Sequence, residues 1–251
     1  MWDLLILNPM INLLLWIYSL LGDFGIAIIL FTLLSRVVTY PLIVSQMKST
    51  QALTDLQKSK EWLDLQKKYK DDKQKLQVEQ ARMMQEKGVN PAGSCLPLLI
   101  QMPIIFGLYQ ALNAAMAATP IQLVSFSKHI YPFFDVSTLI PLKSQFLWMD
   151  LGQPERLYIL SFGVPVLAII TVISQYLLGQ VMTPPSANPN DQSAQMSKMM
   201  NLYMPLMMGW LTYTVPAGLG VYFVASNIFT FAQYALMGKL NWDQLIPWLK
   251  K

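Results

Sequence analysis

The chain has 251 residues, of which 54% are hydrophobic and only 13% are charged. An average soluble domain carries about 25% charged residues, so most of this sequence lacks the charged surface that a soluble fold needs. The net charge of +4 is modest, and basic residues alternate with acidic ones, which gives no case for nucleic-acid binding. The composition therefore predicts an integral membrane protein of the all-α class.

Charge is concentrated in one part of the chain. Residues 44–93 hold about ten Lys or Arg and seven Asp or Glu, roughly half of all charged residues. A transmembrane helix needs about 20 apolar residues to cross a hydrocarbon core about 30 Å thick. On that scale we predict five transmembrane helices, an N-terminal interfacial helix and a cytoplasmic helical hairpin. The predicted transmembrane helices cover residues 23–44, 94–118, 157–178, 199–215 and 216–237.

The last two predicted helices come from one apolar stretch, which the turn-forming run that begins at Pro216 divides. At the other end of the chain, residues 1–22 are apolar but are interrupted by Asn8, Pro9 and Asn12. Only Gly22-Asp23 separates this segment from the next helix, so we expect it to lie in the membrane interface.

The distribution of Lys and Arg predicts the orientation. If residues 45–93 are cytoplasmic, the loop at 179–198 and the tail at 238–251 lie on the same side, and the loop at 119–156 lies outside. That arrangement places about 14 basic residues inside and about three outside. We therefore expect the N-terminus outside and the C-terminus in the cytoplasm.

The cytoplasmic excursion at 45–93 has a helical pattern. Trp62, Tyr69, Leu76 and Met83 recur every seven residues. The run at 70–73 interrupts the pattern, and either of its two aspartates could cap a following helix. Gly88 and Pro91 are typical of the end of a helix. Two antiparallel helices of about five turns each fit better than one rod, because the chain must return to the membrane at Cys95.

Arg36 is the strongest functional signal. It lies about 13 residues into the first predicted span, where an arginine costs about 2.5–3.5 kcal/mol to insert. Thr32, Thr39 and Tyr40 share its helical face. The alternative is that Arg36 extends to the cytoplasmic interface. No acidic residue lies inside any predicted span, so a positive charge there would attract an acidic client group, and a proton relay is disfavoured.

Polar side chains in other predicted spans could share a cavity with Arg36. Singly, each amide could equally form an interhelical hydrogen bond that holds the bundle together. Ser174 and Thr230 belong to the same polar set. The candidate groove residues are Arg36, Thr32, Thr39, Gln101, Gln110, Asn113, Gln175, Ser226, Asn227 and Gln233.

Enzymatic constellations are missing from the sequence. The single histidine, His129, and the single cysteine, Cys95, have no cluster of ligands at metal-binding spacing. Neither a GxSxG nor an HExxH motif occurs, and paired intramembrane aspartates are absent. The sequence therefore predicts a protein that is not an enzyme, with no catalytic, cofactor or metal site.

Three motifs give the sequence a specific resemblance. The first span contains SRVVTYPL at 35–42, and the second begins with NPAGSCLP at 90–97 followed by LIQMPI at 99–104. The last span combines PAGL at 216–219 with Tyr222, Asn227 and Gln233. Together they resemble the YidC membrane protein insertase family, in its minimal five-span bacterial form. Phe223 departs from the tryptophan that many members carry at this position.

The resemblance implies a location in the bacterial plasma membrane and a mechanism of insertion. Family members form a hydrophilic groove that is open to the cytoplasm and to lipid, and Arg36 matches the groove arginine. The resemblance implies nascent membrane proteins as clients, with a Sec translocon and a ribosome as further partners. The hairpin would meet clients first, and their apolar helices would pass from the groove into the bilayer. No cofactor is implied.

Two alternatives belong to other functional classes. A small-solute transporter or channel is one, although the sequence has no inverted repeat and no broken-helix ion site. A structural assembly factor that only holds partner helices is the other, and it would tolerate loss of Arg36. The methionine-rich run at 196–208 is compatible with ordinary lipid-facing packing or with a flexible surface for varied apolar clients.

Overall fold

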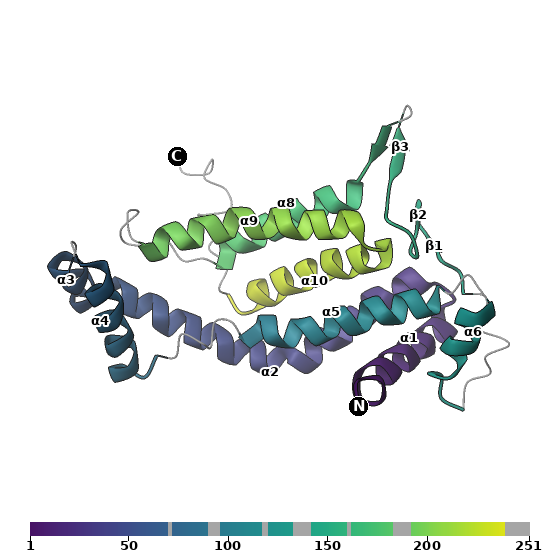
Figure 1. The fold of residues 1–251 in the computed structure, drawn as a ribbon, viewed down its shortest axis with the longest axis horizontal. Coiled ribbons are helices and arrows are strands. Elements are labelled where there is room, and N and C mark those ends of the chain that lie inside the picture. Colours follow the sequence, from purple (N-terminus) through teal and green to yellow (C-terminus); the bar gives the residue numbers. More distant parts are fainter. Residues whose placement is uncertain are drawn as a thin grey trace. The chain divides into compact units, whose positions relative to one another are not determined.

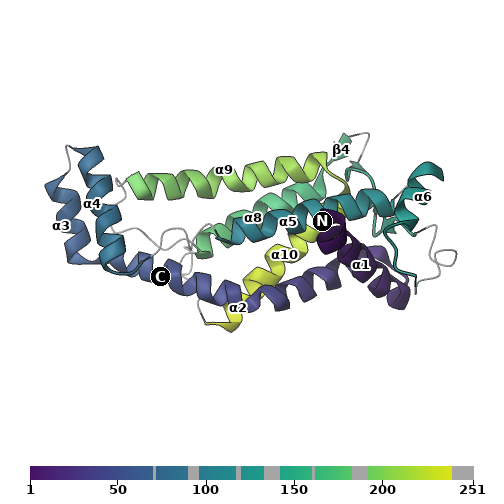
Figure 2. The same ribbon diagram turned by 60° about the horizontal axis from the view of Figure 1, so that its bottom comes forward.

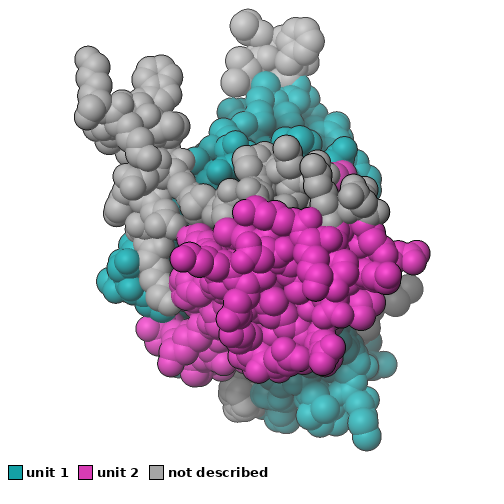
Figure 3. Space-filling model, turned by 90° about the vertical axis from the view of Figure 1, so that its left-hand side faces the viewer, with its two compact units in different colours: residues 1–37, 102–182, 200–251 teal, residues 38–101, 183–199 magenta. Residues whose placement is uncertain are grey.

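The computed structural model is built mainly of helices (Figure 1). It divides into two compact units, which are treated separately below (Figure 3). Unit 1 comprises residues 1–37, 102–182 and 200–251, and unit 2 comprises residues 38–101 and 183–199. The residues that the structure describes are 1–69, 72–89, 96–116, 120–132, 142–159, 162–182 and 192–238.

The N-terminal segment is helical without a break. A short π-helix, η1 (Asp3–Leu7), continues directly into α1 (Asn8–Leu21), so Pro9, the second residue of α1, lies inside a continuous helical segment. Gly22 ends α1 with a positive φ of 69°, a conformation that glycine adopts without strain. Asp23 then accepts a hydrogen bond from Ile26 N at 3.0 Å and caps the next helix.

That next helix, α2 (Phe24–Lys58), is 35 residues long. The predicted end of the first helix at residue 44 is therefore wrong. Pro41 lies inside α2 and does not terminate it. Hydropathy marks where a chain leaves lipid, whereas a helix continues as long as the following residues favour it, as Gln51, Leu53 and Leu56 do. About four turns that we had assigned to the hairpin thus extend the first helix.

The hairpin itself lies in unit 2 and pairs α3 (Lys60–Lys68) with α4 (Lys73–Glu86). Its helices have 9 and 14 residues, so the expectation of about five turns each was too long. The Ser59 hydroxyl accepts from Trp62 N, and the Asp72 carboxylate accepts from Lys75 N at 3.1 Å. Of the two aspartates that the sequence offered as caps, Asp72 caps α4.

Buried Trp62 lies at the start of α3, and α4 ends before Gly88, as predicted. An ion pair of 2.8 Å between Glu61 and Lys87 brings the two ends of the hairpin together. Both side chains are about half exposed, so this pair contributes little to stability, about 0–1 kcal/mol. The ion pair does show that the chain enters and leaves the hairpin at nearby points.

In unit 1, α5 (Leu96–Ala115) packs along the N-terminal helices from residue 102 onward (Figure 2). Gly107 makes the close approach possible, since a Cβ there would lie 2.6 Å from the sulfur of Met10 and 2.9 Å from Ile6 Cγ2. Ile11, Leu14, Phe24 and Leu108 belong to the same buried cluster. This apolar cluster is the core of unit 1.

The loop between the second and third predicted spans contains a helix, α6 (Pro120–Ser127), and two short strands. These are β1 (Gln145–Phe146) and β2 (Met149–Asp150), which pair antiparallel with Phe146 opposite Met149. Buried Met149 and Leu151 attach this hairpin to the core of unit 1.

The predicted start of the third span at residue 157 is wrong. Residues from Leu157 form a second antiparallel hairpin, β3 (Leu157–Ile159) with β4 (Phe162–Val164), and the helix α8 (Val166–Met182) begins only after Pro165. The hydropathy of a short apolar run is the same whether the run forms a strand or a helix. Aromatic and β-branched residues favour the strand, and Pro165 is suited to the position before a helix.

The long apolar stretch near the C-terminus is divided into α9 (Gln192–Thr214) and α10 (Ala217–Leu236). The division falls at Val215-Pro216, as Pro216 predicts, although residues 217–220 belong to the second helix and not to a turn. Helix α9 begins seven residues before the predicted 199. Helix α10 packs on α8, and Gly220 permits this contact because a Cβ there would overlap the side chain of buried Leu167.

Three helical segments in the described part of the chain are long and apolar enough to cross a membrane. They are Asp3–Leu21, Phe24–Lys58 and Ala217–Leu236, and Val166–Val181 is a shorter apolar helix. Asp3–Leu21 meets this criterion of length and hydropathy. Its interfacial placement therefore stays a prediction, as does the count of five spans.

Candidate functional site

Arg36 and residues of α10 form a polar cluster inside unit 1. The guanidinium of Arg36 donates a hydrogen bond from Nη2 to the hydroxyl of Ser226, which is 4% exposed. About two turns further along α10, Gln233 donates from Nε2 to the backbone oxygen of Arg36 at 3.4 Å. Tyr222, one turn before Ser226 on α10, is buried. Two residues of α10 therefore bond to Arg36.

The local geometry of this cluster follows from helical periodicity. Tyr222, Ser226, Thr230 and Gln233 are separated by four, four and three residues, which places them on one face of α10. Thr230 is buried and donates to the backbone oxygen of Ser226 at 2.7 Å, so its hydroxyl is satisfied within the helix. The Ser226 hydroxyl, by contrast, accepts a hydrogen bond from the guanidinium of Arg36. A hydroxyl orients the arginine but adds no opposite charge.

A second set of polar contacts holds α10 to α8. Asn227 donates from Nδ2 to the Ser174 hydroxyl at 2.9 Å, and Ser174 donates to the backbone oxygen of Thr171 at 3.1 Å. This is the interhelical hydrogen bond that the sequence offered as the alternative role for each amide. Asn227 thus ties two helices together, whereas Ser226 beside it contacts Arg36.

The other predicted groove residues lie in several places. Thr32 is fully buried and donates to Ile28 O at 2.7 Å within its own helix. Gln110 accepts a hydrogen bond of 2.7 Å from the indole of Trp2, and Asn113 is exposed on α5. Gln175 is half-buried in α8. Thr39 and Gln101 belong to unit 2, which is not placed relative to the Arg36 cluster.

Helix α2 is poorly covered by the rest of the protein around Arg36. Only 22% of its most apolar 18-residue window is buried, compared with 56% for α10. Val37 and Val38, which follow Arg36, are largely exposed. Arg36 itself is half-buried. The cation therefore lies between a packed helix, α10, and a helix face that other molecules can reach.

At one end of the bundle in unit 1, a loop accepts hydrogen bonds from the first residues of two helices. The first N–H groups of α10 donate to this loop, from Ala217 to Gln153 O at 2.8 Å and from Gly218 to Leu151 O at 3.0 Å. The N-terminus of α8 is capped by Glu155, whose carboxylate accepts from Leu167 N at 3.1 Å. Helix starts carry unsatisfied donors, and this loop accepts from two of them in α10 and from one in α8.

Glu155 was not among the predicted site residues. It is 4% exposed, and its second oxygen accepts from the indole nitrogen of Trp148 at 2.9 Å. No local spacing could have revealed this cap, because the helix that it caps begins eleven residues later, at Val166. Only the fold of the two hairpins brings Glu155 to α8.

Glu155→Ala is expected to lower the free energy of unfolding by about 1–3 kcal/mol, because the buried Leu167 N loses its acceptor, whereas the indole of half-exposed Trp148 can bond to water instead. Glu155→Gln keeps one acceptor and should cost less. Thermal unfolding of both variants in detergent, followed by circular dichroism, measures the difference. Equal stability of Glu155→Ala and the unmodified chain would show that the carboxylate is not the cap.

His129 makes hydrogen bonds that join the N-terminal helix to the loop at 119–156. Its Nδ1 lies 2.8 Å from Asn8 Oδ1, and its backbone oxygen accepts from buried Asn12 at 2.8 Å. Asn12 Oδ1 also accepts from Tyr131 N at 2.7 Å. Within the described residues, no group of three or more His, Cys, Asp or Glu could hold a metal ion.

These features define a class of protein: a helical membrane protein with several apolar helices and a partly buried arginine beside its last helix. The family described as 60Kd inner membrane protein matches residues 16–243 of the chain. The match covers most of the chain, so the chain belongs to this family, which is the family of the YidC membrane protein insertases. It is a multi-pass protein of the cell membrane.

Several relatives show the same similarity. The chain is 34% identical over 219 residues to "Membrane protein insertase YidC" of Caldanaerobacter subterraneus, with 87% of this chain and 86% of that protein covered. It is 33% identical to "Membrane protein insertase MisCA" of Bacillus subtilis, covering 94% and 78%. It is 31% identical to "Membrane protein insertase YidC" of Pelodictyon phaeoclathratiforme, covering 89% of this chain but 34% of that longer protein.

A solved structure supports the fold. The chain is similar to a crystal structure described as active YidC insertase with the first transmembrane domain resolved, with a TM-score of 0.58 and 26% identity. The similarity covers 86% of this chain and 42% of that one. The chain therefore spans about a third to two fifths of the length of the longer relatives that it matches.

Proposed function

We propose that this chain is a membrane protein insertase, which receives short polar segments of client proteins in a groove beside Arg36 and releases their apolar helices into the bilayer. The observation that carries the proposal is the contact of Arg36 with Ser226 of α10. Arg36 lies on α2, a helix whose apolar residues are mostly exposed. Membership of the YidC family, whose relatives are named insertases, supports the same activity.

The physics of such a groove is simple. A polar client segment loses its hydration when it enters hydrocarbon, and each polar group without a partner costs several kcal/mol there. A hydrophilic groove open to the cytoplasm shortens the distance over which that cost applies. A guanidinium in the groove attracts an acidic client segment, and the low dielectric strengthens the attraction. Transfer of the apolar helix from water to lipid drives insertion, so no nucleotide is required.

The proposal includes a direction across the membrane. The end where the loop at 151–155 binds the starts of α8 and α10 would face outward and stop water from crossing. The hairpin of α3 and α4, which lies in the most highly charged part of the chain, would face the cytoplasm and meet clients first. The N-terminus would then lie outside and the C-terminus inside. A Sec translocon and a ribosome are proposed as further partners.

Reconstitution of the purified chain into lipid vesicles tests the proposal. A short client with an acidic N-terminal tail is added to vesicles with and without the chain, and protease protection measures the fraction inserted. We expect protection that depends on the chain, with no flux of small solutes in the same vesicles. Solute flux without any gain in client insertion would favour a transporter or channel and would contradict the proposal.

A further inference from the structure

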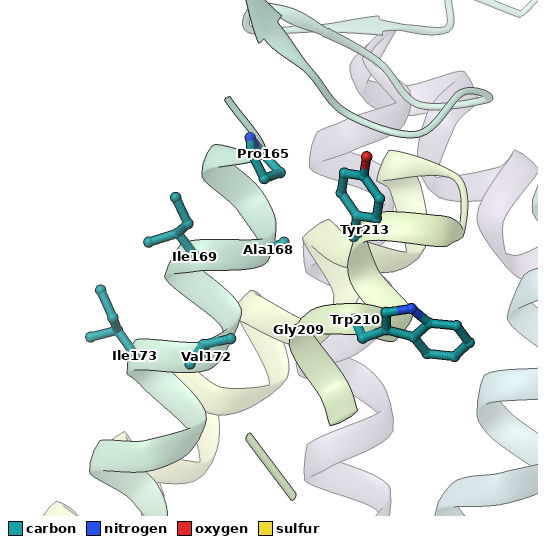
Figure 4. A pocket seen from close by; sticks show the side chains of 8 residues that line it. All are labelled: Pro165, Ala168, Ile169, Val172, Ile173, Gly209, Trp210 and Tyr213. Carbon is teal, nitrogen blue, oxygen red and sulfur yellow. The ribbon is translucent and has the colours of Figure 1, made fainter. Parts of the chain in front are cut away.

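An apolar groove of about 340 Å³ runs between α8 and α9 in unit 1 (Figure 4). Ala168 and Val172 point from α8 toward Gly209 on α9, and Tyr213 stands at the end nearest Pro165 (Figure 4). The groove exists because its facing residues are small. A Cβ at Gly209 would overlap the Val172 side chain and lie 3.5 Å from the backbone oxygen of Ala168.

The groove is open along one side, and a single hydrocarbon chain is narrow enough to lie in it between α8 and α9. The walls are almost entirely apolar, which suits a chain of methylene groups and leaves polar ligands without partners.

A cation lies at the same end of the groove as Tyr213. The guanidinium carbon of Arg156 is 5.3 Å from the centroid of the Tyr213 ring, a cation–π distance. The stem of Arg156 also runs beside Gly163 of β4, where a Cβ would lie 3.6 Å from Arg156 Cδ. Arg156 is exposed, and it makes no ion pair with any residue in the described ranges.

The neighbouring carboxylate does not neutralise this cation. Glu155 is buried, and both of its oxygens accept hydrogen bonds, one from Trp148 and one from Leu167. An exposed arginine at the end of an apolar groove, beside a tyrosine in the last turn of α9, matches the two ends of a phospholipid. The guanidinium would bind the phosphate, and the groove would hold an acyl chain.

We propose that the α8–α9 groove together with Arg156 is a binding site for one anionic phospholipid. Its acyl chain lies against Ala168, Val172 and Gly209, and its headgroup lies on Arg156. A headgroup with net negative charge is favoured over a zwitterionic one, because each basic residue near the membrane surface attracts it by about 1 kcal/mol, or about fivefold in occupancy. The site is separate from the Arg36 cluster, and the proposal does not depend on insertase activity.

Quenching by brominated lipid tests this site in the full chain. The chain is reconstituted in phosphatidylcholine vesicles that contain a minor fraction of acyl-brominated phosphatidylglycerol or acyl-brominated phosphatidylcholine. Trp210 lies on the groove, and its signal is the fluorescence lost in Trp210→Phe. We expect brominated phosphatidylglycerol to reach half-maximal quenching of Trp210 at about a fivefold lower fraction than brominated phosphatidylcholine.

Two variants decide the role of the cation. Arg156→Gln should remove the preference, while Lys143→Gln, which removes another exposed basic side chain of the same loop, should keep it. Equal quenching by the two lipids in the unmodified chain would overturn the proposal, as would a preference that survives in Arg156→Gln. Relief of quenching by a client peptide, equally with either lipid, would identify the groove as a client site and would also overturn it.

Discussion

Arg36→Ala is expected to reduce the insertion of a client with an acidic tail by about thirtyfold. At an effective dielectric constant of about 20, two unit charges about 4 Å apart attract by about 4 kcal/mol. If half of this attraction, about 2 kcal/mol, contributes to the free energy of client binding, the occupancy of the groove rises roughly thirtyfold. Arg36→Lys keeps the charge and should retain most of the activity. Protease protection of the client in vesicles that contain each variant measures the effect.

The client provides the matched control for this prediction. Replacing the acidic residues of the client tail with their amides removes the partner of Arg36, so the same Arg36→Ala change should then have little effect. The coupling between the two changes isolates the charge interaction from any general damage to the bundle. If Arg36→Ala impaired acidic and neutral clients equally, Arg36 would have a structural role, through its bond to Ser226, and not the role proposed here.

Deletion of the hairpin is expected to impair capture of clients more than their transfer. The ion pair between Glu61 and Lys87 places the two ends of the hairpin close together, so a short Gly-Ser linker can join Ser59 to Lys87. A client held on the hairpin is tethered to the chain that carries the groove, which raises its effective concentration there. Without it, insertion should fall by about tenfold or more at low client concentration and recover as the client concentration rises.

The initial rate of insertion as a function of client concentration distinguishes these outcomes. Glu61→Gln serves as the control, because it breaks the ion pair with Lys87 but leaves both helices in place, and an exposed pair contributes little to stability. A deletion that lowered the maximal rate and left the concentration dependence unchanged would show that the hairpin acts after capture. A deletion without effect would remove the hairpin from the mechanism.

Local signals predicted the points where helices begin and end better than hydropathy did. Asp72 caps α4, Gly22 ends α1, and Pro216 separates α9 from α10, because each residue acts through its own backbone or side chain. Hydropathy, in contrast, gave the wrong start for α8. Residues 157–164 are as apolar as a span but form two strands. Hydropathy reports solubility in lipid and does not distinguish a strand from a helix.

The candidate site was predicted in part. The sequence singled out Arg36, Ser226 and Gln233, and the structure brings these three together. The sequence could not show that Gln110 bonds to Trp2, because the rotation of α5 and the position of the N-terminal segment decide that contact. Periodicity identifies which residues share a face of one helix. It does not identify which faces of two helices meet, since that depends on packing throughout the bundle.

The central claim is that this chain inserts clients by means of the charge of Arg36. The most direct test is complementation in a bacterium depleted of its own insertase, with insertion of a short client that has an acidic N-terminal tail as the readout. We expect the unmodified chain and Arg36→Lys to restore insertion, and Arg36→Ala, at equal abundance in the membrane, to fail. Full rescue by Arg36→Ala, or no rescue by a well-expressed unmodified chain, would contradict the claim.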